Sequence, residues 1–396
     1  MSGWKRTLLG ELISIRGGFS YQGKYIGSGK SFLLGMGCVS YSDKFLLSGA
    51  RAYAGDCPRS YLVNPGDIVL ATRQQSDNLP ILGLPALIPK DLGGKNVIAG
   101  ANLYVVKNDS EVDNKFLYWL LKTPNYRNHI SACSKGTTVR MITKDAVESF
   151  EFDCPAKVER ENISNTLWSI ENKIDLLHLQ NKTIESLAET LFRQWFVEEA
   201  KQDWEIIKIA DVAEINSRTI TKKYPFNEIE YLDTGSITNG TIEEFKPCAL
   251  NNAPSRAQRI IVDNDIVYSL VRPIQRHYGL LNGLKPNAIA STGFCVISCR
   301  DFSPHFLYLL LTRTENVEYF DMIAEGSTST YPSLKPSDIA NFEFQKPPNE
   351  KLIEFTKLVS VSWEKINSNR AQIQTLTQLR DDLLPKLMSG EVRVEI

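Results

Sequence analysis

The sequence predicts an α+β protein in which two pseudo-repeated globular α/β domains are separated by a two-helix antiparallel coiled coil. The first observation is a heptad seam, with apolar residues spaced alternately by four and three, that occurs once in each half of the chain. The second is the mixture of short strand patterns and few helices in the segments before each seam. The third is that the same short motifs recur in the same order in both segments.

These patterns divide the chain into four segments. We place the first globular domain at residues 1–155 and the first long helix at residues 156–200. The second globular domain then takes residues 201–347, and the second long helix takes residues 348–396. Proline stands just before each helix, where it ends the preceding strand.

Each long helix has one apolar seam that needs a partner helix. The first seam consists of Ile163, Leu167, Ile170, Ile174, Leu177, Asn181, Ile184 and Leu191, and the second of Val359, Ile366, Asn369, Ile373, Leu376 and Leu383. Because each helix follows its own domain, antiparallel pairing of the two is the simplest way to bury both seams. The domains are then expected at opposite ends of a rod of about 48 Å, from Ile163 to Trp195.

Two asparagines interrupt the apolar seams. Asn181 and Asn369 either pair with each other and fix the register of the helices, or face water at a loosened point of the coiled coil. The sequence leaves both alternatives open.

Composition is that of an ordinary globular protein, with 42% hydrophobic and 23% charged residues. No apolar run reaches the roughly 20 residues of a membrane span, and the first ten residues lack a signal-peptide core, so we expect a cytoplasmic location. The seven cysteines include no Cys-x-x-Cys pair and do not cluster with the four histidines, so no metal site is expected.

The net charge of -1 hides a difference between the segments. Residues 1–157 hold 19 Lys/Arg and 13 Asp/Glu, a charge of +6, whereas residues 201–347 hold 15 and 18, a charge of -3. A chain that binds nucleic acid with this balance relies on local basic patches, or on a partner that supplies positive charge.

No catalytic or cofactor motif is complete, so no catalytic residue is expected. Gly27-Ser-Gly-Lys-Ser31 resembles the end of a P-loop, but Lys24 stands where the first glycine is required. Gly35-Met-Gly37 lacks the third glycine of a dinucleotide fingerprint. The chain has neither the Asn/Asp-Pro-Pro-aromatic tetrapeptide expected of an amino-methyltransferase nor a Gly-x-Ser-x-Gly nucleophile elbow.

Duplex DNA is the partner that the repeated loops favour. Arginine and glutamine, which can grip base edges with two hydrogen bonds, follow equivalent strands in both halves, and hydroxyl-rich loops that suit phosphate follow later. The alternative is that these are ordinary solvated loops without a binding role. Their recurrence in both halves favours a shared role. The candidate DNA-binding residues are Arg73, Gln74, Gln75, Lys135, Thr137, Thr138 and Arg140 in the first half, and Arg272, Gln275, Arg276, Ser327, Thr328, Tyr331 and Lys335 in the second.

The chain resembles the specificity (S) subunit of type I restriction-modification systems along essentially its whole length. The resemblance is carried by motifs that occur twice in the same order: Pro65-Gly-Asp-Ile-Val69 with Arg73 and Asp265-Ile-Val267 with Arg272, Phe-Leu-Tyr at 116 and 306, the Gly-Thr-Thr and Gly-Ser-Thr loops, and the heptad helices.

The resemblance implies a division of labour within a larger complex. Each globular unit is then a target-recognition domain that reads one half of a split DNA target, and the helices act as spacer and dock methyltransferase (M) subunits, two in the usual case, which a restriction (R) subunit can join. S-adenosylmethionine and ATP would bind to the partners, with no cofactor on this chain. The rival hypotheses are a coiled-coil scaffold, or a DNA-methyltransferase component without sequence readout of its own.

Overall fold

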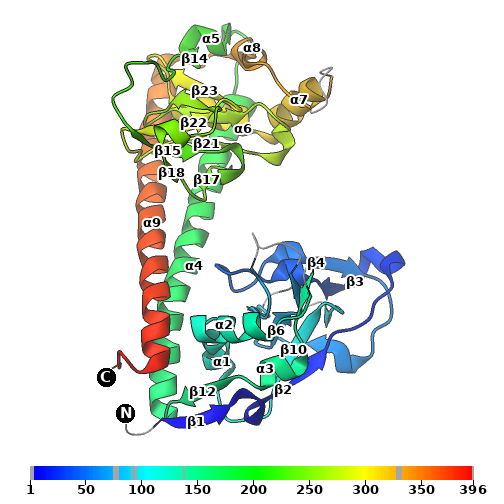
Figure 1. Cartoon of the computed structure of the whole chain (residues 1–396). Coiled ribbons are helices and arrows are strands. Elements are labelled where there is room, and N and C mark those ends of the chain that lie inside the picture. Colours follow the sequence, from blue (N-terminus) through cyan, green and yellow to red (C-terminus); the bar gives the residue numbers. More distant parts are fainter. Residues whose placement is uncertain are drawn as a thin grey trace. The chain divides into compact units, whose positions relative to one another are not determined.

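The computed structural model describes residues 4–74, 80–90, 92, 96–136, 139–326 and 332–394. These residues form two compact units (Figure 1). Unit 1 comprises Met1–Asp175 and Gln374–Ile396, and unit 2 comprises Leu176–Ile373. Each unit therefore contains one globular domain and the adjoining parts of both long helices.

Unit 1 is built from two four-stranded sheets and two short strand pairs. The first sheet is antiparallel in the order β2-β10-β6-β8, and the second has the order β4-β3-β9-β5 with a parallel β3–β9 pair. The strand bounds are β1 Lys5–Leu8, β2 Ile13–Gly17, β3 Ile26–Leu34, β4 Ala50–Tyr53, β5 Leu62–Val63, β6 Ile68–Ala71, β7 Arg73–Gln74, β8 Pro85–Leu87, β9 Asn96–Ala99, β10 Leu103–Asn108, β11 Arg140–Met141 and β12 Glu151–Cys154.

Three short helices of unit 1 begin at side-chain caps. Asp113, Thr123 and Thr143 each accept a hydrogen bond from a backbone N–H in the first turn of the helix that follows. These helices are α1 Asn114–Leu120, α2 Pro124–Cys133 and α3 Lys144–Glu148.

The Gly27-Ser-Gly-Lys-Ser31 stretch lies within strand β3, which continues to Leu34. A phosphate-cradling loop has to open a helix, so the structure agrees with the absence of a P-loop. Gly27 and Gly29 have φ values of +100° and +110°, and the β3–β4 register shifts between Ile26 and Ser31. The glycines therefore form a bulge in the strand.

Unit 2 repeats the strand order of unit 1. Its sheets run β14-β23-β20-β21 and β18-β15-β22-β19, and the β15–β22 pair is again parallel. The bounds are β13 Ile206–Lys208, β14 Ala213–Ile215, β15 Glu228–Leu232, β16 Ile237–Thr238, β17 Thr241–Ile242, β18 Lys246–Ala249, β19 Ala257–Ile260, β20 Ile266–Ser269, β21 Tyr278–Leu280, β22 Ala288–Ser291, β23 Phe294–Cys299 and β24 Glu343–Gln345. The helices are α5 Ile209–Val212, α6 Pro304–Thr312, α7 Thr314–Glu325 and α8 Pro336–Ala340. This matching order confirms the duplicated α+β fold.

One turn shows why the repeated motif forms the same structure twice. Gly66 and Asn264 both have positive φ, +88° and +67°, which glycine and asparagine tolerate best. The following Asp67 and Asp265 carboxylates accept hydrogen bonds of 2.7 and 2.8 Å from backbone N–H groups three residues earlier. Each turn leads into a strand that is buried throughout, β6 or β20.

The two long helices are α4, Lys157–Arg193, and α9, Asn349–Ser389, and a π-helical turn, Gln194–Glu198, follows α4. They run antiparallel within each unit. In unit 1, Glu171 pairs with Arg380 and Glu159 with Arg393, and in unit 2, Glu185 pairs with Arg370 and Glu199 with Lys351. These pairs confirm the predicted antiparallel coiled coil.

The seam residues lie on the inner faces of this helix pair. Ile163, Leu167, Ile174, Leu177, Asn181, Val359, Ile366 and Asn369 are buried, and Ile170, Ile184, Leu191, Ile373, Leu376 and Leu383 are half-buried. Each helix also buries a tryptophan against its own domain: Trp168 packs on Tyr118, and Trp363 on Tyr308, with ring centroids 5.6 and 5.9 Å apart. The buried stripe is therefore wider than a simple seam.

Among the helices of the described residues, none combines the length and the apolar character that a membrane crossing requires.

Candidate nucleic-acid interface

In unit 1 the structure brings two of the predicted DNA-binding segments together. Strand β7 carries Arg73 and Gln74, and it pairs with β11 so that Gln74 lies opposite Arg140 and Arg73 opposite Met141. Arg73 is exposed and Arg140 is half-buried. A two-stranded ribbon of this kind is narrow enough to enter a DNA groove.

The ribbon continues into a second backbone pairing, between Lys135 and Met141. Lys135 and Met141 exchange backbone hydrogen bonds of 2.9 and 2.8 Å, which close the loop between them. Gly136 has φ +100°, and a Cβ atom there would lie 2.2 Å from the Val139 carbonyl oxygen, so only glycine fits. Lys135 is exposed on this loop. Gln75, Thr137 and Thr138 lie outside the described residues.

Gln74 takes a different position from the one expected of a base-reading residue. Its side chain is buried, with 7% of the residue's surface exposed, and its Oε1 accepts a hydrogen bond of 3.4 Å from the Leu82 backbone N–H. A buried side chain cannot reach a base edge in this conformation. We therefore correct its expected role: in this conformation Gln74 does not reach a base and instead accepts a hydrogen bond from Leu82.

Unit 2 has the equivalent pairing at the end of strand β20. The Leu334 N–H donates to the Leu270 carbonyl at 2.7 Å, as the Ile142 N–H donates to the Thr72 carbonyl at 3.1 Å in unit 1. Val271 and Ser333 form an isolated antiparallel bridge. The same strand end and the same later loop therefore meet in both units.

This pairing also corrects the equivalence of the two arginines. Counting from the matched strands β6 and β20, Arg73 corresponds to Val271, whereas Arg272 corresponds to the buried Gln74. Neighbouring strand positions point to opposite faces. The two arginines therefore lie on equivalent ribbons of the two units but differ by one position in register.

Arg272 and Arg276 adopt a backbone conformation that is uncommon for residues with a side chain. Their φ values are +47° and +58°, and they flank the short 3-10 helix Pro273–Gln275. The Asp321 carboxylate of α7 accepts a hydrogen bond of 3.1 Å from the Ile274 N–H, which holds the turn on the domain. Left-handed residues of this kind cluster at functional sites. Arg272 and Gln275 are exposed, and Arg276 is half-buried.

Lys335 lies at the start of α8, next to the paired Leu334. Its side chain is exposed, and its backbone N–H donates to the Asp338 carboxylate at 2.7 Å. Ser327, Thr328 and Tyr331, which the sequence also predicts as DNA-binding, lie outside the described residues.

Sequence reasoning missed a polar cluster where the helix pair meets the unit 1 domain. Glu171 and Arg380 form a buried ion pair of 2.8 Å, and Arg380 also contacts Asp381 at 2.8 Å. Nearby, the Lys122 ammonium donates to the Tyr118 hydroxyl at 3.1 Å. Burial, with the nearby Arg380 charge, lowers the pKa of Lys122 to about 8. Arg380 at a seam position was the one sequence signal for this cluster.

In unit 2 the corresponding junction pairs Arg370 with Glu185 at 3.3 Å. The Tyr308 side chain, from the second Phe-Leu-Tyr motif, is half-buried nearby, and desolvation raises its pKa well above the ordinary value. The two Phe-Leu-Tyr motifs therefore anchor the helix pair in their respective units and are not part of the loops.

The two seam asparagines bond to each other. The Asn369 Nδ2 donates to the Asn181 Oδ1 at 2.8 Å, and both residues are buried. Of the two alternatives, the structure has the paired one, in which the amides satisfy one another inside the apolar seam.

Within the residues that the structure describes, no group of three or more His, Cys, Asp or Glu is placed to hold a metal ion. Burial raises the pKa of the Cys38, Cys295 and Cys299 thiols to about 12, so these thiols are poor nucleophiles.

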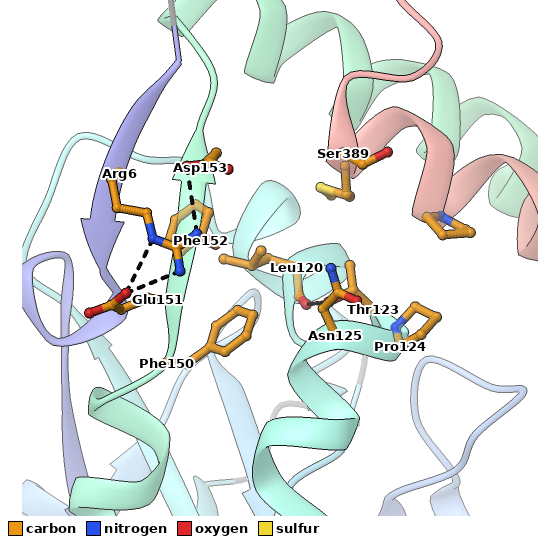
Figure 2. A pocket seen from close by; sticks show the side chains of 12 residues that line it. Arg6, Leu120, Thr123, Pro124, Asn125, Phe150, Glu151, Phe152, Asp153 and Ser389 are labelled. Atoms are coloured by element: carbon orange, nitrogen blue, oxygen red, sulfur yellow. Dashed lines mark hydrogen bonds and ion pairs between the residues drawn. The ribbon is translucent and has the colours of Figure 1, made fainter. Parts of the chain in front are cut away.

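One pocket of about 160 Å³ lies in unit 1 between strand β12 and the last turn of α9. Figure 2 shows Arg6 turned toward Glu151 and Asp153, with which it forms ion pairs of 3.0 and 3.6 Å. Phe150, Phe152 and Leu120 supply apolar lining. The arginine is already neutralised by its neighbours, and the pocket has no nucleophile–base pair.

The fold defines a class: a protein with two copies of one α+β domain, each joined to the same pair of long antiparallel helices. A family model described as type I restriction modification DNA specificity domain matches residues 1–186 and again residues 201–377. The chain therefore belongs to the family of type I restriction-modification specificity subunits, whose function is DNA sequence recognition.

Individual relatives agree with this family. The chain is 25% identical over 324 residues to the type I restriction enzyme MjaIX specificity subunit of Methanocaldococcus jannaschii, covering 74% of this chain and 72% of that one. It is 30% identical over 189 residues to the HindI specificity subunit of Haemophilus influenzae, covering 46% and 40%. The crystal structure of a type I S subunit from M. genitalium has the same fold, with a TM-score of 0.59, 17% identity, and coverage of 97% of this chain and 96% of that one.

Proposed function

We propose that each globular domain reads one half of a bipartite, gapped DNA target and that the paired helices set the spacing between the halves. The observation that carries this proposal is the same ribbon in both units, formed by residues 72–74 with 140–142 and by residues 270–272 with 332–334. Two copies of one reading device, with different side chains on each, suit a target made of two different half-sites.

The exposed arginines Arg73 and Arg272 are the proposed contacts to base edges in the first and second half-site. Lys135, Arg140, Gln275, Arg276 and Lys335 supply further contacts to bases or phosphates. The same role is proposed for Gln75, Thr137, Thr138, Ser327, Thr328 and Tyr331 on sequence alone.

Replacing each arginine singly with alanine tests this assignment. Arg73→Ala is expected to relax discrimination at the first half-site only, by about 1–3 kcal/mol, and Arg272→Ala at the second half-site only. The measurement is the affinity of the complex with its methyltransferase partner for duplexes that carry substitutions in one half. Equal relaxation of both half-sites by either variant contradicts the assignment.

The same proposal assigns the catalysis to partner subunits. This chain then has no activity of its own. Two methyltransferase subunits per chain bind S-adenosylmethionine. Where a restriction subunit is present, it binds ATP and completes the complex. An apolar stripe on α4, opposite the seam, supports docking of a partner helix. Leu176, Leu179 and Leu187 are 46%, 61% and 57% exposed there, which is high for leucines on one helix face.

A further inference from the structure

The two domains differ in charge at equivalent places. Residues 16–59 of the first domain and 218–259 of the second each hold six Lys/Arg, but the first stretch has two Asp/Glu and the second has five. The net charges are therefore +4 and +1. The difference lies in the carboxylates, because the number of cations is the same.

In unit 1 five of these cations come from the same segments as a group of packed aromatic rings. We name this surface the basic–aromatic face, and it consists of Arg16, Lys24, Lys30, Arg51 and Arg59 with Phe19, Tyr21, Tyr25, Tyr53 and Tyr61. The Arg16 guanidinium lies 5.7 Å from the Tyr61 ring centroid, and the Lys24 ammonium lies 4.9 Å from the Tyr25 ring centroid. Both distances are those of cation–π contacts.

The aromatic rings of this face pack against one another. Phe19 contacts Tyr61 at 5.4 Å and Tyr53 at 6.3 Å, and Tyr53 in turn contacts Tyr25 at 6.1 Å between centroids. Arg51 is two residues from Tyr53 on strand β4, and Arg59 opens the 3-10 helix Arg59–Tyr61 that ends at Tyr61. Arg51 and Arg59 are exposed.

The glycine bulge of β3 precedes Lys30, the remaining cation of the five. Gly29 has φ +110°, and a Cβ atom there would lie 2.3 Å from the Tyr53 carbonyl oxygen, so the bulge packs directly on the strand that carries Tyr53. Lys30 follows it and is exposed, and its neighbour Ser31 is the register partner of Tyr53. The incomplete P-loop motif therefore places an exposed lysine one residue before the register partner of Tyr53.

Over the part of the chain that the structure describes, none of the five cations forms an ion pair with a carboxylate. Of the two carboxylates in this stretch, Asp43 accepts hydrogen bonds from the Ser40 and Ser42 hydroxyls. In the equivalent stretch of unit 2, two cations are paired, Arg218 with Asp265 and Lys246 with Glu244. Uncompensated like charges repel one another, and a polyanion removes that cost.

We infer that the basic–aromatic face contacts the phosphate backbone of duplex DNA and gives the first domain the larger share of the salt-dependent affinity. This inference rests on the proposed function and adds to it that the two readers contribute unequally. Arginine and lysine neutralise phosphates without reading sequence. The Tyr61 and Tyr25 ring faces hold the Arg16 and Lys24 cations in place.

The test uses the full chain in complex with its methyltransferase partner. The variant Lys24→Ala/Lys30→Ala/Arg59→Ala removes three exposed cations, and the matched control Lys222→Ala/Lys223→Ala/Arg256→Ala removes three exposed cations from the equivalent stretch of the second domain. The measurement is the dissociation constant for a duplex with the target and for one with the first half-site altered, each as a function of salt concentration. Thermal unfolding of each variant checks the fold.

The triple variant is expected to reduce the slope of log affinity against log salt by about 2 to 3, since each phosphate contact contributes about 0.9. Both duplexes lose affinity equally, by about tenfold or more at low salt, and their ratio stays unchanged. An unchanged slope, an equal effect of the control, or a loss confined to the target duplex overturns the inference. Failure of the wild-type complex to prefer the target refutes the proposed function instead, whatever the slope shows.

Discussion

At the residue scale, the helix pair is specified by a few polar side chains inside an apolar seam. Asn181 bonds to Asn369 in unit 2, and Glu171 bonds to Arg380 in unit 1. A shift of one residue would separate each pair and leave buried polar groups unsatisfied. The amide pair was foreseeable from the heptad pattern, because both asparagines occupy seam positions. The partner of Arg380 was not, because Glu171 lies beside the seam.

Replacing one asparagine of the pair and replacing both should have different effects on the free energy of unfolding. Asn369→Ala leaves the Asn181 amide buried without its partner and is expected to lower the free energy of unfolding by about 1–3 kcal/mol. The double variant Asn181→Leu/Asn369→Leu is expected to be neutral or stabilising, because both polar groups leave together. Urea denaturation of both variants measures this. Equal destabilisation by the two would show that the amide bond does not govern the seam.

Burial of Lys122 predicts a pH dependence of stability. Its pKa is lowered from 10.5 to about 8, so between these values the unfolded chain holds a proton that the folded chain has lost. The contribution of Lys122 to the free energy of unfolding therefore rises with pH between about 8 and 10.5. Below pH 8 the destabilisation caused by burying the charged ammonium is fully present. Lys122→Met should stabilise the protein at pH 7 by about 2–3 kcal/mol and remove this rise. Urea unfolding at pH 7, 8.5 and 10 checks both effects, and a lower stability at pH 7 would contradict them.

At the element scale, the sequence predicted which elements form but not how the strands pair with one another. The turns before β6 and β20 follow from residues that tolerate positive φ, so the repeated motif predicted them correctly. The pairing of β7 with β11 brings together segments far apart in sequence, which a local pattern cannot show. For the same reason Arg73 and Arg272 seemed equivalent, and Gln74 seemed free to read bases, although strand alternation buries it.

The exposed leucine stripe of α4 gives a prediction for assembly. Leu179→Glu/Leu187→Glu places two charges where an apolar partner helix is proposed to dock, and co-purification with the methyltransferase subunit is expected to fall at least about tenfold, a cost of about 1.4 kcal/mol. Thermal unfolding of the isolated chain should change little, because both residues are exposed. Lys182→Glu, an exposed substitution with the same change in net charge, is the control. Undiminished co-purification of the double variant would place docking elsewhere.

At the scale of the whole molecule, one α+β unit occurs twice and each copy carries its own part of the same two helices. The duplication was predictable because the motifs keep the same order in both halves, even where the residues between them differ. The unequal charge of the copies was visible in the sequence, but its concentration on the basic–aromatic face required the fold.

Changing the helix length should change the DNA target. Deletion of one heptad, Ile170 to Leu176, shortens α4 by about 10 Å. The expected result is a shorter gap between the half-sites or loss of the complex, as judged by the modified motif and by co-purification. An unchanged gap with full activity contradicts a spacer role for the helices.

The central claim is that one chain carries two independent readers, and single-molecule sequencing of cellular DNA tests it most directly. DNA from cells that express this chain with its methyltransferase partner would be searched for modified adenines and their sequence context. The account predicts a split, asymmetric motif with an unread gap, of which only one half changes when residues 1–155 are exchanged for those of a relative. A short continuous motif, or a change in both halves after the exchange, would contradict it.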